Sequence, residues 1–249
     1  MDFNIPEELE SVKQLAAQIL SDFTAVEQLR LLEQQAEPFD ATLRQALAEA
    51  GLLGVDIAEA QGGTGQGFYA LTSLSYEVGR TVAAVPVVPV LVSAAGTLRR
   101  FAGDEQKEQL LPAIANGSLL VSAGLEEYNN DNPTKPSCAA RSVEGGFALS
   151  GTKIGVSQAA RASRILVSAT TGEELVVALV DPNAAGVTLS PQVVTSGETR
   201  HEIKLSEVQV PTEDIVAVGG KALEAMEWAQ QATRTALSAM AVGVCDKMM

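Results

Sequence analysis

The hydrophobic pattern of the chain changes its period twice, and these changes limit the possible folds more than any other feature. Up to residue 117, apolar residues recur at spacings of three and four, which is typical of amphipathic helices. Short apolar runs separated by turn signals follow, and this pattern is typical of strands. Helical spacing then returns. We therefore predict an α+β protein with an N-terminal all-helical domain over 1–117, a middle β-domain over 118–217 and the first helix of a C-terminal helical domain over 218–249.

Capping signals divide the first 117 residues into helices. Asp40 fits an N-cap and Gly51 fits the stop of the same helix, because aspartate accepts bonds from free amides and glycine adopts the left-handed conformation. Pro112 is expected to interrupt the last of these helices, and Gly117 is expected to end it. The predicted helices cover residues 7–20, 24–36, 41–50, 68–83, 87–101 and 104–117.

The middle segment contains seven short apolar runs, a density that favours a β-barrel-like domain or a β-sandwich. Two of the runs, 138–143 and 147–154, flank the glycine-bearing residues 144–146, so we expect a hairpin with a three-residue loop. Gly151 is expected to bend the second of these strands. His201 cannot build a metal site alone and is expected to be an ordinary strand residue. The predicted strands cover 119–125, 138–143, 147–154, 165–169, 175–180, 187–189 and 199–210.

Residues 220–247 carry an apolar helical stripe that runs from Leu223 to Met240. Small residues on the same helix, among them Ala236 and Gly243, permit close contact with another helix. We expect this helix to dock on the β-domain or on a partner chain, or to belong to a larger helical bundle. In the isolated chain the stripe is expected to be exposed and to mark an interface.

Composition restricts the partners and the location. The net charge of −14 argues against nucleic acid and anionic membranes as partners, because their phosphates would be repelled. No apolar run reaches the roughly 18 residues of a membrane-spanning helix. The acidic start lacks a signal-peptide pattern, so a cytoplasmic location is expected. Cys138 and Cys245 stand far apart and indicate neither a disulfide framework nor a zinc site.

Five stretches resemble motifs of the acyl-CoA dehydrogenases, in the same order and with matched spacing. The stretch G-F-A-L-S-G-T-K-I-G-V-S-Q at 146–158 is similar to the family's G-W-x-L-N-G-x-K-x-W-I-[ST]-N, which lies on the flavin. The other four stretches are 39–67, 77–81, 104–117 and 201–216. The likeness covers essentially the whole chain, whereas members of the family continue well past position 249.

The resemblance implies a chemistry and a set of partners. Acyl-CoA dehydrogenases remove an α-proton and a β-hydride from an acyl-CoA thioester; a glutamate takes the proton, and N5 of FAD takes the hydride. It further implies a dimer or tetramer of like or unlike subunits, and an electron-accepting flavoprotein as a partner.

The family's first flavin motif, L-T-E-P-x-A-G-S-D, falls on residues 125–133. The resemblance therefore implies that Leu125, Glu126 and Glu127 contact the flavin, although Glu126 replaces the threonine that bonds its pyrimidine. Asp131 and Asn132 replace the Gly-Ser pair that approaches the FAD pyrophosphate. A carboxylate there faces like charge, at a cost on the order of 1 kcal/mol or more. Asn132 is expected to contact the substrate.

The second flavin motif, W-I-[ST]-N, falls on residues 155–158 and makes Gly155, Val156 and Ser157 expected cofactor contacts. Gly155 replaces the tryptophan that packs against the flavin. Ser157 keeps the hydroxyl that lies near flavin N5.

The catalytic glutamate has no counterpart in the chain. In most of the family it lies beyond position 249, and in a subgroup it lies on the helix that corresponds to 220–249, next to an arginine. Here Arg234 is present and is expected to contact the substrate, but Thr233 occupies the place of that glutamate. Glu224 and Glu227 are out of register and are expected to be solvated. We therefore expect no catalytic residue in this chain.

Two functional hypotheses follow. In the first, the chain is a FAD-dependent acyl-CoA dehydrogenase subunit whose full site needs further residues or a partner. In the second, it is a flavin-free subunit that completes a heteromeric dehydrogenase. Retention of Leu125, Glu127 and Ser157 favours the first hypothesis, and the altered flavin motifs favour the second.

Overall fold

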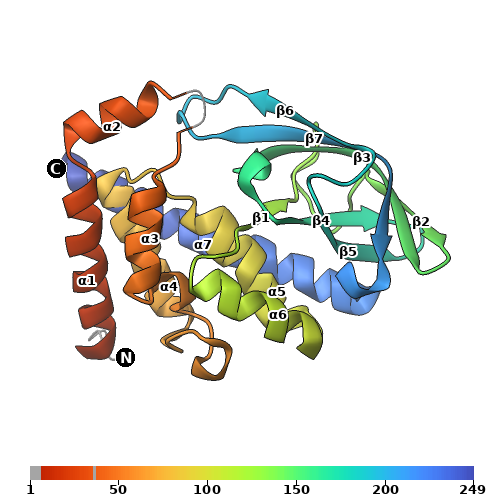
Figure 1. The fold of residues 1–249 in the computed structure, drawn as a ribbon, viewed down its shortest axis with the longest axis horizontal. Helices are drawn as coiled ribbons and strands as arrows, with labels where there is room; N and C mark the ends of the chain where they lie inside the picture. The colour runs from red at the N-terminus through yellow and green to blue at the C-terminus, as the bar shows by residue number, and fades with distance from the viewer. Residues whose placement is uncertain (1–6, 36–37) are drawn as a thin grey trace.

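The computed structural model describes residues 7–35 and 38–249. Figure 1 shows a helical part beside a sheet part, with the long helix α7 (Gly220–Met248) running along both. The predicted order of helices is confirmed, although the end of the predicted helix 24–36 lies outside the described residues. The helical part contains α1 (Glu7–Phe23), α2 (Val26–Glu33), α3 (Ala41–Glu49), η1 (Leu52–Gly54), η2 (Glu59–Gln61), α4 (Gly67–Thr81), the π-helix η3 (Val88–Ala95), α5 (Gly96–Phe101) and α6 (Asp104–Ala115).

Three of the four helix signals act as predicted, one of them at Gly117, which follows the end of α6 with a φ of 81°. Asp40 caps α3, because its Oδ1 accepts a hydrogen bond from the Leu43 amide at 2.8 Å, and Gly51 follows the helix with a φ of 73°. The prediction for Pro112 is wrong, since α6 continues through it to Ala115. Pro112 lies in the last turn, where the loss of one amide donor disturbs only the end of the helix.

Eight strands of the described residues form one mixed sheet in the order β6-β7-β3-β2-β4-β5-β8, with β1 paired in parallel to β4. The additional strand β8 is absent from the predicted set because a four-residue apolar run shows no alternation. The strands are β1 (Val121–Gly124), β2 (Ala139–Val143), β3 (Gly146–Ser157), β4 (Arg164–Thr170), β5 (Leu175–Val180), β6 (Val187–Gln192), β7 (Arg200–Pro211) and β8 (Ile215–Val218), with η4 (Ala159–Arg161) before β4 and η5 (Thr212–Asp214) before β8.

The sheet curls over at β2, which pairs with β4 at one position only, Ala139 with Thr170. In Figure 1, β6, β7 and β3 therefore lie over β1, β4 and β5, and the end strands β6 and β8 are not paired with each other in the described chain. The predicted β2–β3 hairpin is present, but its loop has two residues instead of three, because Val143 pairs with Gly146.

Strand β3 is bent as predicted. Its register against β7 shifts at Gly151, where a Cβ atom would lie 2.8 Å from the Cα of Cys138, and shifts again between Lys153 and Val156. The second shift extends β3 to Ser157, beyond the predicted end at residue 154, and it shapes the site described below. His201 lies buried on β7, as expected of a strand residue.

Helix α7 joins the two parts of the molecule. It packs against α4, η3 and α5 on one side and against β5 and β8 on the other. Its closest approach to α4 is a contact of backbones: a Cβ on Gly243 would lie 2.0 Å from the Tyr76 carbonyl oxygen, and a Cβ on Gly79 would lie 2.1 Å from that of Met240. The predicted role of small residues in close helix contact is confirmed at Gly243.

The prediction that the stripe on α7 is exposed is wrong. Met226, Ala229 and Ala236 are completely buried, because the N-terminal helices cover them. The expected docking on the β-domain is confirmed by the contacts of α7 with β5 and β8, whereas docking on the N-terminal helices was not among the three expectations. Large apolar side chains that remain exposed on α7 are Leu223, Leu237, Val242, Val244 and Met248. No helix of the described residues has both the length and the apolar character needed to cross a bilayer.

The contact between α4 and α7 generates a stability prediction. Gly243→Ala should lower the free energy of unfolding by about 1–3 kcal/mol, because the added methyl overpacks against the Tyr76 carbonyl. Gly220→Ala on the same helix is the matched control, since a Cβ there meets no atom within 4 Å. Urea unfolding of both variants measures the difference, and equal stability of the two variants would contradict the packing described here.

Candidate functional site

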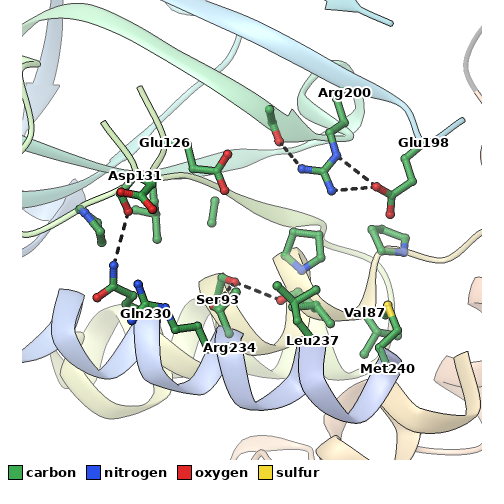
Figure 2. Close-up of a pocket in the computed structure, with 18 of the residues that line it drawn as sticks. Val87, Ser93, Glu126, Asp131, Glu198, Arg200, Gln230, Arg234, Leu237 and Met240 are labelled. Atoms are coloured by element: carbon green, nitrogen blue, oxygen red, sulfur yellow. Dashed lines mark hydrogen bonds and ion pairs between the residues drawn. The ribbon is translucent and has the colours of Figure 1, made fainter. Parts of the chain in front are cut away.

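The main cavity has a volume of about 300 Å³ and lies between the sheet and the helical part. Figure 2 shows β3 and β7 with the segment after β1 above the cavity, and α7 below it. The segment from Val85 to Pro89 and Ser93 of η3 close the apolar side, and Leu237 and Met240 extend that surface along α7. Polar groups gather at the opposite end, where Asp131, Gln230 and Arg234 lie.

A charged pair from β7 and the loop before it stands over the cavity. The Arg200 guanidinium contacts the Glu198 carboxylate at 2.7 Å, and its Nη1 donates to the Gly155 carbonyl oxygen at 3.1 Å. Figure 2 shows both side chains reaching toward α7, Arg200 from β7 and Glu198 from the loop before it. Three further charges in the lining, on Glu126, Asp131 and Arg234, make no side-chain hydrogen bond or ion pair with another described residue.

A second cavity of about 330 Å³ adjoins the main one. Its walls come from α2, the end of α4, the loop before β7 and the end of α7, and they include Ser157 and Gln158. The two cavities share four lining residues, so they meet where these residues stand: Val85, Pro86, Glu198 and Met240.

The boundary divides the predicted flavin contacts. Leu125, Glu126 and Gly155 line the main cavity, whereas Ser157 lines the second. Val156 is completely buried in the core beneath them. The structure therefore brings three of the six predicted residues to one place and leaves the Ser157 hydroxyl on the other side of Glu198.

Gly155 has a conformation that explains the missing tryptophan. Its φ is 64°, the left-handed region that favours glycine, and it follows from the register shift in β3. A Cβ at this position would lie 3.3 Å from the Glu126 Oε2. The Gly155 amide donates to the Gln192 Oε1 at 2.7 Å, and this bond from the end of β6 holds the irregular part of β3 in place.

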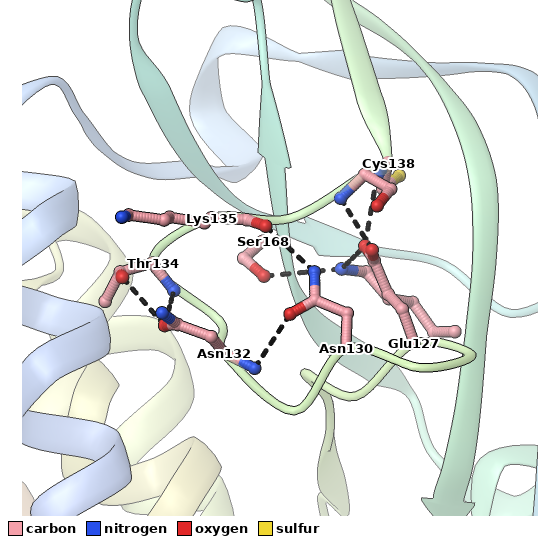
Figure 3. Close-up of polar contacts among 9 residues, drawn as sticks. Glu127, Asn130, Asn132, Thr134, Lys135, Cys138 and Ser168 are labelled. Atoms are coloured by element: carbon pink, nitrogen blue, oxygen red, sulfur yellow. Dashed lines mark hydrogen bonds and ion pairs between the residues drawn. The ribbon is translucent and has the colours of Figure 1, made fainter.

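Glu127 is used inside the fold and lines neither cavity. Its Oε1 accepts from the Lys153 Nζ at 2.6 Å and from the Cys138 amide at 3.0 Å, and its Oε2 accepts from the Ser137 amide at 2.6 Å (Figure 3). Burial raises the pKa of the Glu127 carboxyl, but the Lys153 ammonium and the two amides outweigh it and hold that pKa below its ordinary value. Lys153 is itself fully buried.

The loop that follows Glu127 is ordered by its own amides. In Figure 3, the Asn130 Oδ1 accepts from the Asn132 amide, and the Asn132 Oδ1 accepts from the Thr134 amide, each at 3.0 Å. Asn132, predicted to contact the substrate, thus has its carbonyl oxygen engaged within the loop, while its neighbour Asp131 lines the main cavity. Arg234, the other predicted substrate contact, does line that cavity.

The position of the subgroup's base is occupied by a hydroxyl pair. The Thr233 Oγ1 lies 2.7 Å from the Ser93 Oγ, and both residues line the main cavity. Glu224 and Glu227 are exposed, as expected. Burial raises the pKa of the Cys138 thiol to about 11, so this cysteine is a thiol at neutral pH. No group of three or more His, Cys, Asp or Glu among the described residues could hold a metal ion.

Sequence reasoning did not identify Lys153, Glu198 or Arg200. Lys153 could have been identified, because it is a lysine inside an otherwise apolar strand pattern, and a buried lysine needs a partner. Glu198 and Arg200 gave none, since their place over Gly155 depends on the shifted register between β3 and β7.

Comparisons with known proteins agree on one family. Residues 6–118 match the family model for the N-terminal domain of acyl-CoA dehydrogenase. The acyl-CoA dehydrogenase FadE28 of Mycobacterium tuberculosis is 33% identical over 173 residues, which are 70% of this chain and 48% of that protein. The chain spans about half the length of the curated relatives it matches.

Solved structures give the same likeness. A variant of the Tcur3481-Tcur3483 steroid ACAD is 37% identical, with a TM-score of 0.88 over 97% of this chain and 64% of that one. The ChsE4-ChsE5 complex from Mycobacterium tuberculosis is 25% identical, with a TM-score of 0.91 over 99% of this chain and 66% of that one.

The buried pair generates a prediction about pH. Lys153→Met should lower the free energy of unfolding at neutral pH by about 3–5 kcal/mol, because Glu127 would stay buried without its counter-charge. In the wild-type chain, the stability from Glu127 is present above its unfolded pKa of about 4.3 and is lost as the pH falls through the lowered folded pKa. In the variant the folded pKa is raised, so mild acidification should stabilise instead.

Urea unfolding between mildly acidic and neutral pH measures both effects. Lys204→Met, at an exposed lysine of β7, is the control and should change stability by no more than about 0.5 kcal/mol. A loss in Lys153→Met no larger than in this control, or an unchanged pH slope, would show that the pair does not support the fold.

Proposed function

Because the chain belongs to the acyl-CoA dehydrogenase family, we propose that it is the non-catalytic subunit of a heteromeric acyl-CoA dehydrogenase. In this role it receives part of an acyl-CoA substrate in the main cavity and holds no FAD of its own. The observation that carries the proposal is the division of the expected flavin contacts by the Glu198–Arg200 pair.

The first argument is steric. A flavin ring is flat and rigid, so its contacts must share one continuous surface. Gly155 and Ser157 are two residues apart on β3, yet they open into different cavities, and Glu198 lines both. Arg200 is bonded to the carbonyl of Gly155 itself. A ring that contacts both Gly155 and Ser157 would have to displace this pair.

The second argument is electrostatic. FAD carries a charged pyrophosphate, and the main cavity presents the carboxylates of Glu126, Asp131 and Glu198. Arg200 neutralises only Glu198, and Arg234 is the remaining cation of the lining.

The third argument concerns the proton. Abstraction of an α-proton needs a carboxylate within about 3 Å of it in the bound substrate. Thr233 and Ser93 hold each other's hydroxyls at the position of the subgroup's base, and neither is a base at neutral pH. Glu126 lies on the sheet side of the cavity, which the resemblance assigns to the flavin.

What remains is a cavity suited to an apolar acyl group with a polar entrance. Val87, Leu237 and Met240 supply apolar contact area, and the exposed Arg234 supplies a positive charge for the anionic CoA portion. Structures named as a complex of two unlike chains and as a steroid ACAD are among those this chain resembles, which supports a heteromer that acts on a bulky apolar acyl group.

One observation favours the other hypothesis. Ser157 is 3% exposed, and its hydroxyl makes no hydrogen bond with a described residue, so it is free to bond a ligand such as flavin N5. In that case the chain would hold FAD and pass electrons to an electron-accepting flavoprotein. The two hypotheses differ in flavin content and in turnover, which the following experiments measure.

Restoring the family's residues should create affinity for FAD. The combined variant Glu126→Thr, Asp131→Gly and Asn132→Ser should bind FAD on the order of tenfold more tightly than the wild-type chain, because one carboxylate leaves the pyrimidine side and one leaves the pyrophosphate side. The control is Glu224→Gln with Glu227→Gln, which removes the same charge from the exposed face of α7. Equilibrium titration with FAD measures both, and an equal gain in the control would show that net charge alone matters.

The wild-type chain alone should not oxidise acyl-CoAs. The test is reduction of an electron-accepting dye with acyl-CoAs of several lengths and FAD in excess. Turnover that Glu126→Gln abolishes would reverse the assignment of the base, whereas turnover that appears only with a partner subunit supports the proposal.

A further inference from the structure

We propose that Glu198 and Arg200 determine the size of the acyl group that the chain accepts, because they close the passage from the main cavity into the second. This inference rests on the proposed function, since it deepens the account of the same site. It assigns a role to the second cavity, which otherwise has none.

The first step is that the two cavities are neighbours. Val85, Pro86, Glu198 and Met240 line both, so no complete layer of side chains lies between them. Their volumes of about 300 and 330 Å³ each lie near the lower end of the roughly 300–1,000 Å³ range of ligand sites. Joined, they would hold an acyl group about twice as large as either holds alone.

The second step is that the boundary has two unlike sides. Pro86 and Met240 form the side toward the helical part and are apolar. Glu198 and Arg200 form the opposite side, where Figure 2 shows them directed toward α7. An apolar chain that passes between the two sides would remove a carboxylate and a guanidinium from water, which costs free energy.

The third step is that the pair is held in place. The Glu198 Oε2 accepts from Arg200 Nη2 at 2.7 Å and from the Ser196 hydroxyl at 3.1 Å, and Arg200 is bonded in turn to the Gly155 carbonyl. The side chain that faces the passage is therefore anchored to β3 and to its own loop. Beyond it the second cavity is apolar along Leu32, Val78 and Val244.

The experiment measures binding of straight-chain acyl-CoAs, from butanoyl-CoA to hexadecanoyl-CoA, to the purified chain by calorimetry. Each buried methylene should tighten binding about fourfold until the main cavity is full. With the wild-type chain the affinity should then stop rising. With Glu198→Ala it should continue to rise, so that the ratio of the affinity for the longest acyl-CoAs to the affinity for butanoyl-CoA becomes at least about tenfold larger than in the wild-type chain.

Glu202→Ala is the matched control, because Glu202 lies on β7 close to Glu198 in the chain and lines neither cavity. Glu198→Gln keeps the size of the side chain and removes its charge. A rise in affinity that continues only part of the way in this variant separates the effect of the charge from the effect of the size. Two outcomes overturn this inference alone. In one, the affinity of Glu198→Ala stops rising at the same acyl-chain length as that of the wild-type chain. In the other, the affinity of the wild-type chain rises through the whole series. No binding of any acyl-CoA by any variant overturns the proposed function as well.

Discussion

The buried ion pair between Lys153 and Glu127 is the interaction on which the site depends. It ties the segment after β1 to β3 from within the sheet, where both side chains are nearly or wholly inaccessible. Because Glu127 points inward, its neighbour Glu126 must point outward, into the main cavity. The Glu126 carbonyl oxygen accepts a hydrogen bond from the Ile154 amide at 2.9 Å, so the backbone of this segment is paired with β3. One internal contact thus decides which side chains the cavity receives.

The opposite wall depends on close packing of helices. Gly79 and Gly243 let the backbones of α4 and α7 touch, and this contact holds α7 against the helical part. Between the two walls, the Glu198–Arg200 pair replaces the continuous surface that a flavin would need. In the proposed function, the altered residues at 126, 131 and 155 act together, since each would remove a contact of the same cofactor while the cavity for an apolar group persists.

Local features of the sequence predicted much of the fold. The caps at Asp40 and Gly51, the change of period near residue 117 and the β2–β3 hairpin each depend on a few adjacent residues. The predictions failed where the outcome depends on distant contacts. Pairing of Lys153 with a glutamate 26 positions away needs the final topology. The place of Arg200 depends on two register shifts, and the docking of α7 on α4 depends on a glycine that lies far earlier in the chain.

The central claim is that this chain keeps the family's fold and acyl cavity but holds no flavin. The most direct test is the flavin content of the protein as purified, from its visible absorption spectrum and from the FAD released by denaturation. The account predicts a colourless protein with far less than one FAD per chain, also after incubation with excess FAD and removal of the unbound cofactor. A yellow protein with one FAD per chain would contradict it.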